Sequence, residues 1–527
     1  MTPSAGEWYF LFDEGGNISQ SLINVRDQEE FNRLQAKLVP LWSSIERFNK
    51  DEQTVVVVPN AEVDFPLTGD ERQAVEERYL FLLLLLRQPR ARMVYVTGQA
   101  IDPVVIDYYL GLLPGVIPSH ARQRLHLVSP LDPSPGPLTE KLLARPSVID
   151  EIRSHITDPD RAHLIPFLTS WKDRELAMRL GIPMYGADPI HLALGTKSKS
   201  RELFAEAGAN HPLGRENLRT EEDLETAIIE MRAGRPELNH LVVKLDEGVS
   251  GAGNADLVLG NLPAPGDPAE AAAVRGRLPA MQFELSDLSY SVFLDKLAAT
   301  GGIVEERIVA DEIRSPSVQL RVTPRGVVEL LSTHDQVLGG PSGQTFLGSR
   351  FPADRGYVCE ISKQAWAIGN LLAAKGVLGR FAIDFVTARM DGGAWSSYAI
   401  EVNLRKGGTT HPFLTLQFLT DGTYDPDTGD FTAPNGDRKY YVASDHVESP
   451  AYRRFTADDL FDVAMMNDLH FDQTRQTGVV FHMMRALPEK GRIGITAVGN
   501  SHEEADQLHA SVVRALDEAA EAVTLVE

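Results

Sequence analysis

The chain has 527 residues, too long for one ordinary domain, and at roughly 150 residues per domain it suggests three or four. Its 51 Lys and Arg residues against 74 Asp and Glu give a formal net charge of −23. A surface with this much negative charge repels nucleic acid and anionic lipid, and we therefore expect neither as a partner. The single cysteine, Cys359, excludes an intrachain disulfide. With no secretory signal and no apolar run near 20 residues, the sequence predicts a cytoplasmic protein.

The first region, residues 1–190, alternates apolar strands with helical stretches. Continuous apolar strands are typical of a parallel sheet that is covered on both faces. The apolar run 79–86 is expected to form one buried helix or strand, and residues 139–180 are expected to be mainly helical. This pattern predicts an N-terminal doubly wound α/β domain. Its strands are expected at 54–60, 91–99 and 124–130.

The middle region, residues 191–420, mixes strands and helices around glycine-rich turns. A helix is expected to end at Gly208, and residues 240–259 read as a strand, a glycine-rich turn and a second strand. An amphipathic helix over 361–376 precedes two further strands. We expect a mixed region of strands and helices here. The strands are predicted at 301–309, 317–324, 326–334, 379–388 and 395–405.

The last region, residues 421–527, is expected to be a small C-terminal α/β domain. Turn-forming residues dominate 421–442, which predicts an excursion containing a hairpin. Ser501 and Glu504 match a capping box at the start of a long terminal helix. Two strands are expected before that helix, at 476–486 and 491–499.

Several common catalytic motifs are missing from the sequence. It has no phosphate-binding loop of the G-x-x-x-x-G-K-[ST] type and no H-E-x-x-H zinc motif. The stretch 251–256 (GAGNAD) lacks the third glycine of a dinucleotide fingerprint. The stretch 248–252 (GVSGA) has alanine where a nucleophile elbow requires glycine.

Polar residues in otherwise apolar strands form the candidate site. Asp384 lies inside the strand FAIDFV, where a charge is unfavourable unless it is paired or bound to a metal. Glu401 and Asn403 are two residues apart and therefore share one face of a strand, with Arg405 next on that face. Two carboxylates and an amide oxygen are hard ligands that suit Mg²⁺ shared with nucleotide phosphates.

Two lysines and a flexible loop provide candidate phosphate contacts. Lys197 precedes a helix, and Lys244 ends an apolar strand just before the glycine-rich loop 247–254. Backbone amides in such a loop can fold over an anion without obstruction by side chains. Lys199 is close enough in the sequence to be an alternative to Lys197.

Together, these features resemble the ATP-grasp carboxylate–amine ligases, most closely the pheganomycin-type peptide ligases. The segment IVEERI matches the acidic hinge of the ATP-grasp family. The closer resemblance extends over nearly the whole chain and is carried by IPMYGADP, GTKSKSR, VVKLDEGVSGAGN, EVNLRKGGTTHP and VVFHMMRALPEKGRIGITAVGNSHEEA. It implies a pre-ATP-grasp domain over 1–190, an ATP-grasp domain of two α+β lobes over 191–420 and a small C-terminal domain over 421–527.

The resemblance also implies roles for individual residues. Lys197 and Lys244 would contact the α- and β-phosphates of ATP, and Glu312 would accept hydrogen bonds from the ribose. Mg²⁺ would be held by Asp384, Glu401 and Asn403. The catalytic residues would be Lys244, Arg405 and His411. The remaining ATP contacts would come from the glycine-rich loop and the hinge between the lobes, namely Glu247, Ser250, Gly251, Gly253, Glu305, Glu306 and Ile308.

The implied reaction joins a small, amino-acid-like carboxylic acid to an amine or peptide acceptor through an acylphosphate, with release of ADP and phosphate. Substrates are expected at 406–412, with 338–346 as a second candidate segment. A homodimer is possible, because many ATP-grasp ligases are dimers. The alternatives are another ATP-grasp reaction, such as a carboxylase or a phosphotransferase, and a non-catalytic ATP-binding protein.

Overall fold

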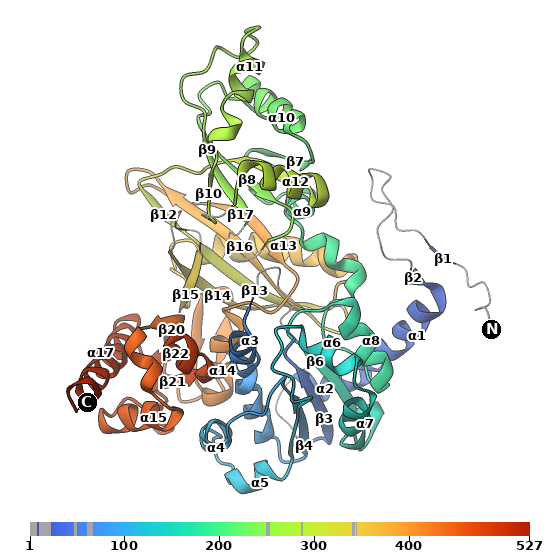
Figure 1. The fold of residues 1–527 in the computed structure, drawn as a ribbon, viewed down its shortest axis with the longest axis vertical. Coiled ribbons are helices and arrows are strands. Elements are labelled where there is room, and N and C mark those ends of the chain that lie inside the picture. The colour runs from blue at the N-terminus through green and yellow to red at the C-terminus, as the bar shows by residue number, and fades with distance from the viewer. Residues whose placement is uncertain are drawn as a thin grey trace.

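The computed structural model describes most of the chain, and its sheets divide the molecule into the regions that Figure 1 shows. The described residues are 8–9, 23–46, 50–60, 67–248, 253–285, 288–339, 343 and 345–526. Ser250 and Gly251, which are candidate phosphate contacts, lie outside these ranges. Strands β1 (Trp8–Tyr9) and β2 (Ile23–Asn24) form a short antiparallel pair.

The N-terminal part is a parallel four-stranded sheet in the order β5-β4-β3-β6. The chain runs outward from β3 to β5 and then returns to the other side of β3, which confirms the predicted doubly wound topology. Val55 and Val57 pack with one group of helices, and Val56 and Val58 pack with the other. The strands are β3 (Gln53–Val58), β4 (Ala91–Val96), β5 (Leu125–Val128) and β6 (Ala162–Pro166).

Short helices cover both faces of this sheet. Several begin at side-chain caps, for example α3 at Thr68 and α8 at Ser170, each part of a complete capping box. The helices are α1 (Val25–Gln35), α2 (Leu38–Glu46), α3 (Gly69–Glu77), α4 (Pro103–Gly111), α5 (Pro118–Arg122), α6 (Leu138–Leu143), α7 (Pro146–Ser154) and α8 (Trp171–Leu180), with 3₁₀ segments η1 (Arg78–Arg87), η2 (Pro159–Arg161) and η3 (Pro189–Gly195).

Strand β6 and the apolar run 79–86 are the two features of this region to compare with the sequence expectations. The expectation that 139–180 is mainly helical is wrong at β6, a five-residue strand that pairs with β3 at one edge of the sheet. Its sequence, AHLIP, is too short and too mixed to show a strand period. The apolar run 79–86 is helical, within η1, and its leucines pack on all sides of that helix, so it lacks an exposed face.

The middle region begins with an antiparallel five-stranded lobe in the order β10-β9-β8-β11-β7, drawn at the top of Figure 1. Helix α9 (Lys197–Ala207) leads into this lobe and ends at Gly208, as expected. The strands are β7 (Gly214–Leu218), β8 (His240–Leu245), β9 (Asn254–Val258), β10 (Gln282–Phe283) and β11 (Gly302–Glu306). The helices are α10 (Glu221–Gly234), α11 (Glu270–Arg275), the 3₁₀ segment η4 (Leu278–Ala280) and α12 (Tyr290–Thr300).

A second lobe is built on a nine-stranded sheet in the order β12-β16-β13-β14-β15-β20-β22-β21, with β17 paired to β16. Helix α13 (Val358–Ala374) packs against β13 and β14, and α14 (Thr410–Thr420) follows β17. The strands of the middle region are β12 (Glu312–Arg314), β13 (Pro316–Val322), β14 (Val328–Gly339), β15 (Thr345–Phe351), β16 (Gly379–Arg389) and β17 (Ser396–Asn403).

The C-terminal residues extend the sheet of this second lobe. Strand β20 pairs with β15, so hydrogen bonding continues across the expected boundary at residue 421. The expected hairpin is formed by β18 and β19. The elements are β18 (Thr423–Asp425), β19 (Asp430–Thr432), β20 (Tyr440–Glu448), η5 (Pro450–Arg454), α15 (Ala457–Met466), β21 (Gly478–His482), η6 (Met484–Ala486), α16 (Leu487–Lys490), β22 (Arg492–Gly499) and α17 (His502–Val526).

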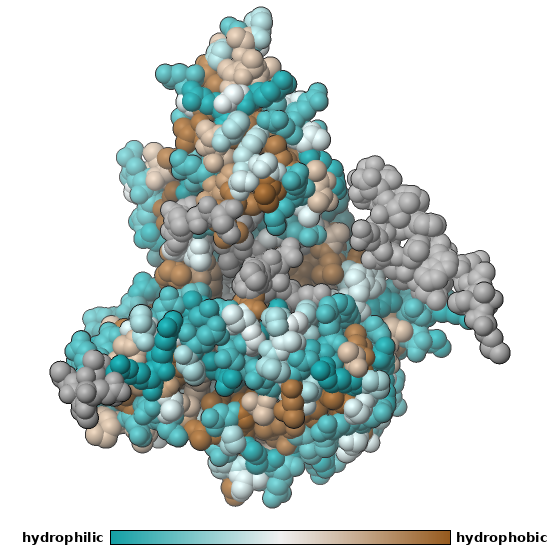
Figure 2. Space-filling view, in the orientation of Figure 1, coloured by the Kyte–Doolittle hydropathy of each residue, from teal (hydrophilic) through white to brown (hydrophobic). Residues whose placement is uncertain are grey.

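The surface agrees with the acidic, polar composition. Hydrophilic residues dominate the face shown in Figure 2. Within the described parts of the chain, no helix has the length and apolar character needed to cross a membrane.

Candidate nucleotide and metal site

Three oxygen-bearing side chains meet on one face of β16 and β17. Asp384 lies directly opposite Glu401 in the antiparallel register, and Asn403 lies opposite Ala382. Because side chains alternate along a strand, Asp384, Glu401 and Asn403 share one face of the sheet. The Asn403 amide donates a hydrogen bond to Asp384 Oδ2 at 2.9 Å. We call these three residues the acidic face.

The two carboxylates of the acidic face repel each other. Burial, and then the charge of Glu401, raise the pKa of Asp384 to about 6, while the Ser317 hydroxyl, Arg405 and Asn403 act in the opposite direction. Burial and the facing carboxylate thus both disfavour the charged form of Asp384. The donor set of two carboxylates and an amide oxygen therefore fits a divalent cation with a preference for oxygen ligands.

Lys197 connects the acidic face to the first lobe. It is the first residue of α9, which is capped by Thr196, and its Nζ lies 3.3 Å from Glu401 Oε1. The same Nζ is 4.0 Å from the position that a Cβ would take at Gly248, where the glycine-rich loop begins. Lys199, the alternative phosphate contact, has its ammonium 2.8 Å from Glu202 on its own helix. Of the two lysines, Lys197 is therefore the one beside the acidic face.

Lys244 and Glu305 form a buried ion pair inside the first lobe. They lie on the neighbouring strands β8 and β11, and the Lys244 ammonium donates to Glu305 Oε1. Arg201 donates to the other oxygen of Glu305 at 3.2 Å. Glu306 accepts a hydrogen bond from the backbone amide of Leu213 at 2.8 Å. These contacts fix the end of β11, where the expected hinge between the lobes begins.

The glycine-rich loop is described at its two ends only. Glu247 is exposed, and the Leu245 amide donates to the Gly253 carbonyl at 3.0 Å. A Cβ at Gly253 would lie 3.1 Å from the Leu245 side chain and 3.3 Å from the Glu247 carbonyl. The close return of the chain at Gly253 therefore favours glycine.

The expected ribose contact lies at the edge of the second lobe. Glu312, on β12, accepts hydrogen bonds from Arg314 at 2.6 Å and from Arg389 at 2.6 Å. Ile308 lies in the connection between β11 and β12. The structure thus places Glu312 in an ion-pair network that also includes two arginines.

The two expected substrate segments come together beside Arg405. A Cβ at Gly408 would lie 2.5 Å from the Phe346 ring, so the stretch 406–412 passes against the end of 338–346. Thr410 donates to Gln319 at 2.9 Å and accepts from the Gly407 amide at 3.0 Å, which fixes the turn after β17. The Arg405 guanidinium donates to the Lys406 carbonyl at 3.4 Å.

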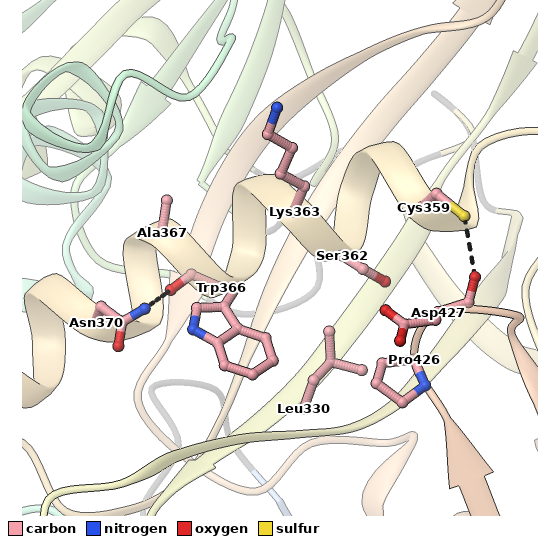
Figure 3. Close-up of a pocket in the computed structure, with 9 residues that line it drawn as sticks. All are labelled: Leu330, Cys359, Ser362, Lys363, Trp366, Ala367, Asn370, Pro426 and Asp427. Atoms are coloured by element: carbon pink, nitrogen blue, oxygen red, sulfur yellow. Dashed lines mark hydrogen bonds between the residues drawn. The ribbon is translucent and has the colours of Figure 1, made fainter.

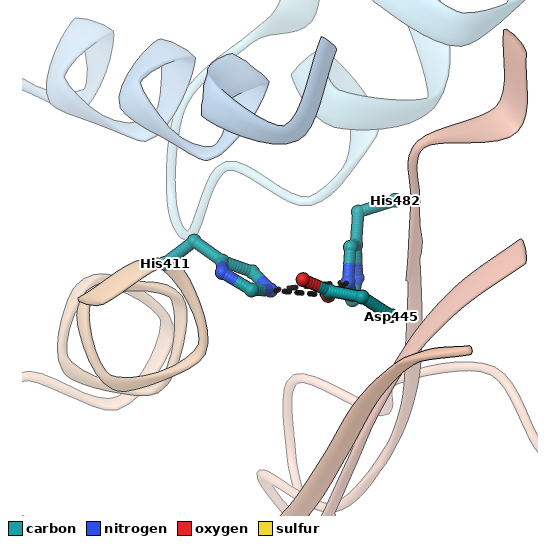
Figure 4. Close-up of side chains that lie close together, drawn as sticks. All are labelled: His411, Asp445 and His482. Atoms are coloured by element: carbon teal, nitrogen blue, oxygen red, sulfur yellow. Dashed lines mark hydrogen bonds and ion pairs between the residues drawn. The ribbon is translucent and has the colours of Figure 1, made fainter. Parts of the chain in front are cut away.

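His411 lies in a buried cluster that the sequence analysis did not assemble. Its Nε2 is 3.0 Å from His482 Nε2 and 3.4 Å from Asp445 Oδ1, and His482 Nε2 is 2.7 Å from the same oxygen (Figure 4). Arg78, from the N-terminal part, donates to Asp445 Oδ2 at 2.6 Å. We call Arg78, His411, Asp445 and His482 the junction, because they come from all three regions of the chain.

The three ligand atoms of the junction are close enough to share a metal ion. Two observations favour a hydrogen-bonded network instead. Arg78 already brings a positive charge to Asp445, and the pKa of that carboxyl is held well below its usual range with His411 and Arg78 nearby. His411 Nδ1 is buried and has no hydrogen-bond partner among the described residues, whereas a histidine bound to a metal usually donates that proton to a second group.

Burial lowers the pKa of His411 to about 3, and the neighbouring Asp445 only partly opposes this. His411 is therefore neutral at physiological pH. Its 2% exposure separates it from solvent in this conformation. A direct catalytic role for His411 thus stays a prediction. No local signal identifies its partners, since Arg78 and Asp445 are 367 positions apart.

A separate pocket lies elsewhere, along α13. It has a volume of about 480 Å³, and its lining includes Cys359, Trp366 and Pro426 (Figure 3). None of the candidate ATP, metal or catalytic residues lines it. This pocket is therefore separate from the acidic face.

Comparisons with known proteins agree with this geometry. Residues 284–427 match the family model described as "IQCH-like, ATP-grasp", and residues 459–512 match "PGM1 C-terminal domain". L-propargylglycine–L-glutamate ligase of Streptantibioticus cattleyicolor is 30% identical over 440 residues, which are 82% of this chain and 86% of that enzyme. The chain belongs to the ATP-grasp carboxylate–amine ligases.

A second relative of this ATP-grasp ligase shares less sequence identity with it. IQ motif-containing protein H of Danio rerio is 23% identical over 409 residues, which are 69% of this chain and 38% of that protein.

Two solved structures share the fold. An ADP complex of N5-carboxyaminoimidazole ribonucleotide synthetase has a TM-score of 0.50 and 11% identity, covering 90% of this chain and 98% of that one. The biotin carboxylase domain of a Hydrogenobacter thermophilus 2-oxoglutarate carboxylase has a TM-score of 0.50 and 11% identity, covering 87% and 89%.

Proposed function

We propose that this ATP-grasp ligase activates an amino-acid-like carboxylic acid with ATP and joins it to an amine, through an acylphosphate. The observation that carries the proposal is the acidic face, with Lys197 reaching it from the start of the first lobe. The relative in Streptantibioticus cattleyicolor is named for L-propargylglycine and L-glutamate, which supports amino acids as both donor and acceptor.

The residues of the acidic face would hold Mg²⁺ through Asp384, Glu401 and the amide oxygen of Asn403. When bound, the ion would neutralise phosphate charge and align ATP for transfer. The Asn403 amide now donates to Asp384, so its oxygen would have to turn toward the ion. The raised pKa of Asp384 fits this assignment, because burial and the facing Glu401 both disfavour its charged form and a cation would favour it.

The lysines and the arginine would position the reacting groups. A carboxylate is a poor acylating agent because its oxygen is a poor leaving group. A carboxylate oxygen attacks the γ-phosphorus of ATP. The new oxygen–phosphorus bond gives an acylphosphate, and the bond between the γ-phosphorus and ADP breaks. Attack of the amine on the acyl carbon then forms the amide, releases phosphate and gives up a proton. Lys197, Lys244 and Arg405 would stabilise the negative charge that moves in the first step.

Further assignments follow from the same proposal. We assign ATP contacts to both ends of the glycine-rich loop and to the β11–β12 connection, and we assign substrates to the place where Gly408 meets Phe346. The three-part division at residues 190 and 420 is retained as a proposal, although one sheet continues past residue 420. A homodimer also stays a prediction.

The test is a screen of ADP release over pairs of amino acids and short peptides. An active pair should release ADP and phosphate in amounts equal to the amide formed, and Glu401→Gln should lose this turnover. Release of AMP and pyrophosphate would contradict the acylphosphate route. Turnover that requires bicarbonate, or a stable phosphorylated product, would indicate the carboxylase or phosphotransferase alternative.

A further inference from the structure

A second group of charged residues lies on the same sheet as the acidic face. Arg380 precedes Asp384 by four residues on β16 and therefore points to the same side of that strand, about 13 Å away along it. Arg380 lies opposite Arg321 of β13 in the register. Together with Lys406 and His163 these arginines line an interior cavity of about 70 Å³ between the N-terminal sheet and the second lobe. We call it the basic cavity.

The contacts around the basic cavity leave part of its positive charge uncompensated. Arg321 donates to Glu329 at 2.6 Å, so this arginine has a counter-charge. Lys406 is 7% exposed, and its ammonium donates to a neutral acceptor, the Pro166 carbonyl, at 2.6 Å. Arg380 has a buried nitrogen, Nη1, with no hydrogen-bond partner among the described residues. None of the described residues that line the cavity is a carboxylate.

His163 adds a second unsatisfied group to the same cavity. Its side chain is 2% exposed, and its Nδ1 has no hydrogen-bond partner within the described ranges. A buried polar atom without a partner is uncommon and calls for an explanation such as a bound ion or water.

The pKa values of three of the basic groups that line the cavity are lowered. Burial and then Arg380 lower the pKa of Lys406 to about 7, and burial and then Arg321 lower the pKa of Arg380 to about 10. Burial and then Lys406 lower the pKa of His163 to about 4. Asp173 acts in the opposite direction on Lys406, but burial raises the pKa of Asp173 itself to about 6. Tyr185 and Glu329 act in the opposite direction on Arg380, but its pKa and that of Lys406 stay lowered.

We propose that the basic cavity binds a small oxyanion, with inorganic phosphate as the first candidate. Its volume of about 70 Å³ is a little more than the liquid share of two water molecules, which excludes a nucleotide. The planar guanidinium of Arg380 and the ammonium of Lys406 are suitable donors to phosphate oxygens. Because Lys406 follows Arg405, a bound anion would tie the end of β17 to the N-terminal sheet.

The experiment measures thermal unfolding of the full chain by tryptophan fluorescence at pH 6.5 and constant ionic strength. Sodium phosphate, sulfate and acetate are each compared with chloride. We expect phosphate to raise Tm in a saturable way, by about 2 °C near tenfold excess over its dissociation constant. The Tm series in acetate shows whether carboxylates bind to the same site. No saturable rise in phosphate would overturn the proposal.

Three variants locate the binding. The phosphate-dependent rise in Tm should be lost in Arg380→Met, and Lys406→Met provides a second test if that variant does not fold. It should persist in Arg405→Met, which removes an arginine of the proposed catalytic site instead. Persistence of the rise in both cavity variants, or its loss in Arg405→Met, would place phosphate outside the cavity and overturn the proposal.

Discussion

The acidic face and the junction both combine carboxylates with nitrogen donors, but they differ in how the carboxylate charge is balanced. At the acidic face, Asp384 and Glu401 are half-buried and face each other, so the pKa of Asp384 is raised. At the junction, Asp445 is buried and has Arg78 on one oxygen and His482 on the other. At the acidic face Glu401 is paired with Lys197 and Asp384 accepts from a neutral amide, whereas at the junction the carboxylate is paired directly with a guanidinium.

This difference separates a ligand site from a structural contact. Closeness of ligand atoms alone would assign a metal to the junction, where three of them lie within 3.4 Å of one another. The charges around each carboxylate indicate the opposite assignment. At the junction Arg78 already neutralises Asp445, so an added divalent ion would be repelled by the guanidinium without relieving any repulsion between carboxylates, whereas at the acidic face it would lie between two facing carboxylates.

The largest expected effect comes from breaking the junction. Asp445→Asn should lower the free energy of unfolding by about 3–5 kcal/mol, because Arg78 is left buried without its counter-charge. Urea unfolding measures the change. The matched control is Asp506→Asn, which removes an exposed ion pair with Arg350 and should change stability by less than about 1 kcal/mol.

Metal analysis of the wild-type protein tests the comparison between the acidic face and the junction. If the junction holds a metal, the purified wild-type protein should contain it in a one-to-one ratio by elemental analysis, and a chelator should lower its Tm. A metal-free protein of unchanged stability in chelator is the outcome that we expect.

The next effect is catalytic and belongs to the acidic face. Asp384→Asn should reduce kcat for ADP release by about 10²–10³-fold, because it removes one of two negative charges available to a cation near the phosphates. Asp391→Asn, in the exposed turn after β16, is the control and should keep wild-type turnover. Equal activity of the two variants would remove Asp384 from the proposed site.

The acidic face could be predicted from the sequence because each of its residues stands out among its own neighbours in the chain. Asp384 interrupts an apolar strand, and the two-residue spacing of Glu401 and Asn403 specifies a shared face whatever the surrounding fold. The doubly wound N-terminal part was accessible for a similar reason, since three of its four strands are long β-branched or apolar runs. Strand β6 was missed because five residues that include His163 and Pro166 show no clear period.

The junction and the basic cavity could not be predicted in the same way. Each forms only when segments far apart in the chain pack together, and Arg78 and Lys406 show no unusual pattern among their neighbours in sequence. The continuation of one sheet past residue 420 is likewise a matter of tertiary pairing between β15 and β20. The sequence indicates the two strands but does not say that they are partners.

A smaller effect is expected from acid at the junction. The folded-state pKa of His411 is lowered to about 3, below its ordinary value of 6.5, so the fold favours the neutral ring. This stabilisation is complete above about pH 6.5 and is lost as the pH falls toward 3. Between pH 6.5 and pH 5 it should decline by about 2 kcal/mol.

His411→Gln should make stability less dependent on pH over that range, as measured by urea unfolding at each pH. His120→Gln changes an exposed histidine on α5 and should leave the wild-type slope. An unchanged slope in His411→Gln would show that other groups cause the acid sensitivity.

The smallest expected effect concerns Glu312, the expected ribose contact. Glu312→Gln should raise KM for ATP about tenfold with little change in kcat, because glutamine keeps the shape but accepts hydrogen bonds more weakly. Its ion pairs with Arg314 and Arg389 are partly exposed, so their loss should cost about 1 kcal/mol or less of stability. Glu448→Gln, which removes a similar pair with Arg492, is the control for that loss. If Glu312→Gln lowers Tm only as much as the control does and leaves KM unchanged, Glu312 is a structural partner of the arginines. The ribose contact would then lie elsewhere along the β11–β12 connection.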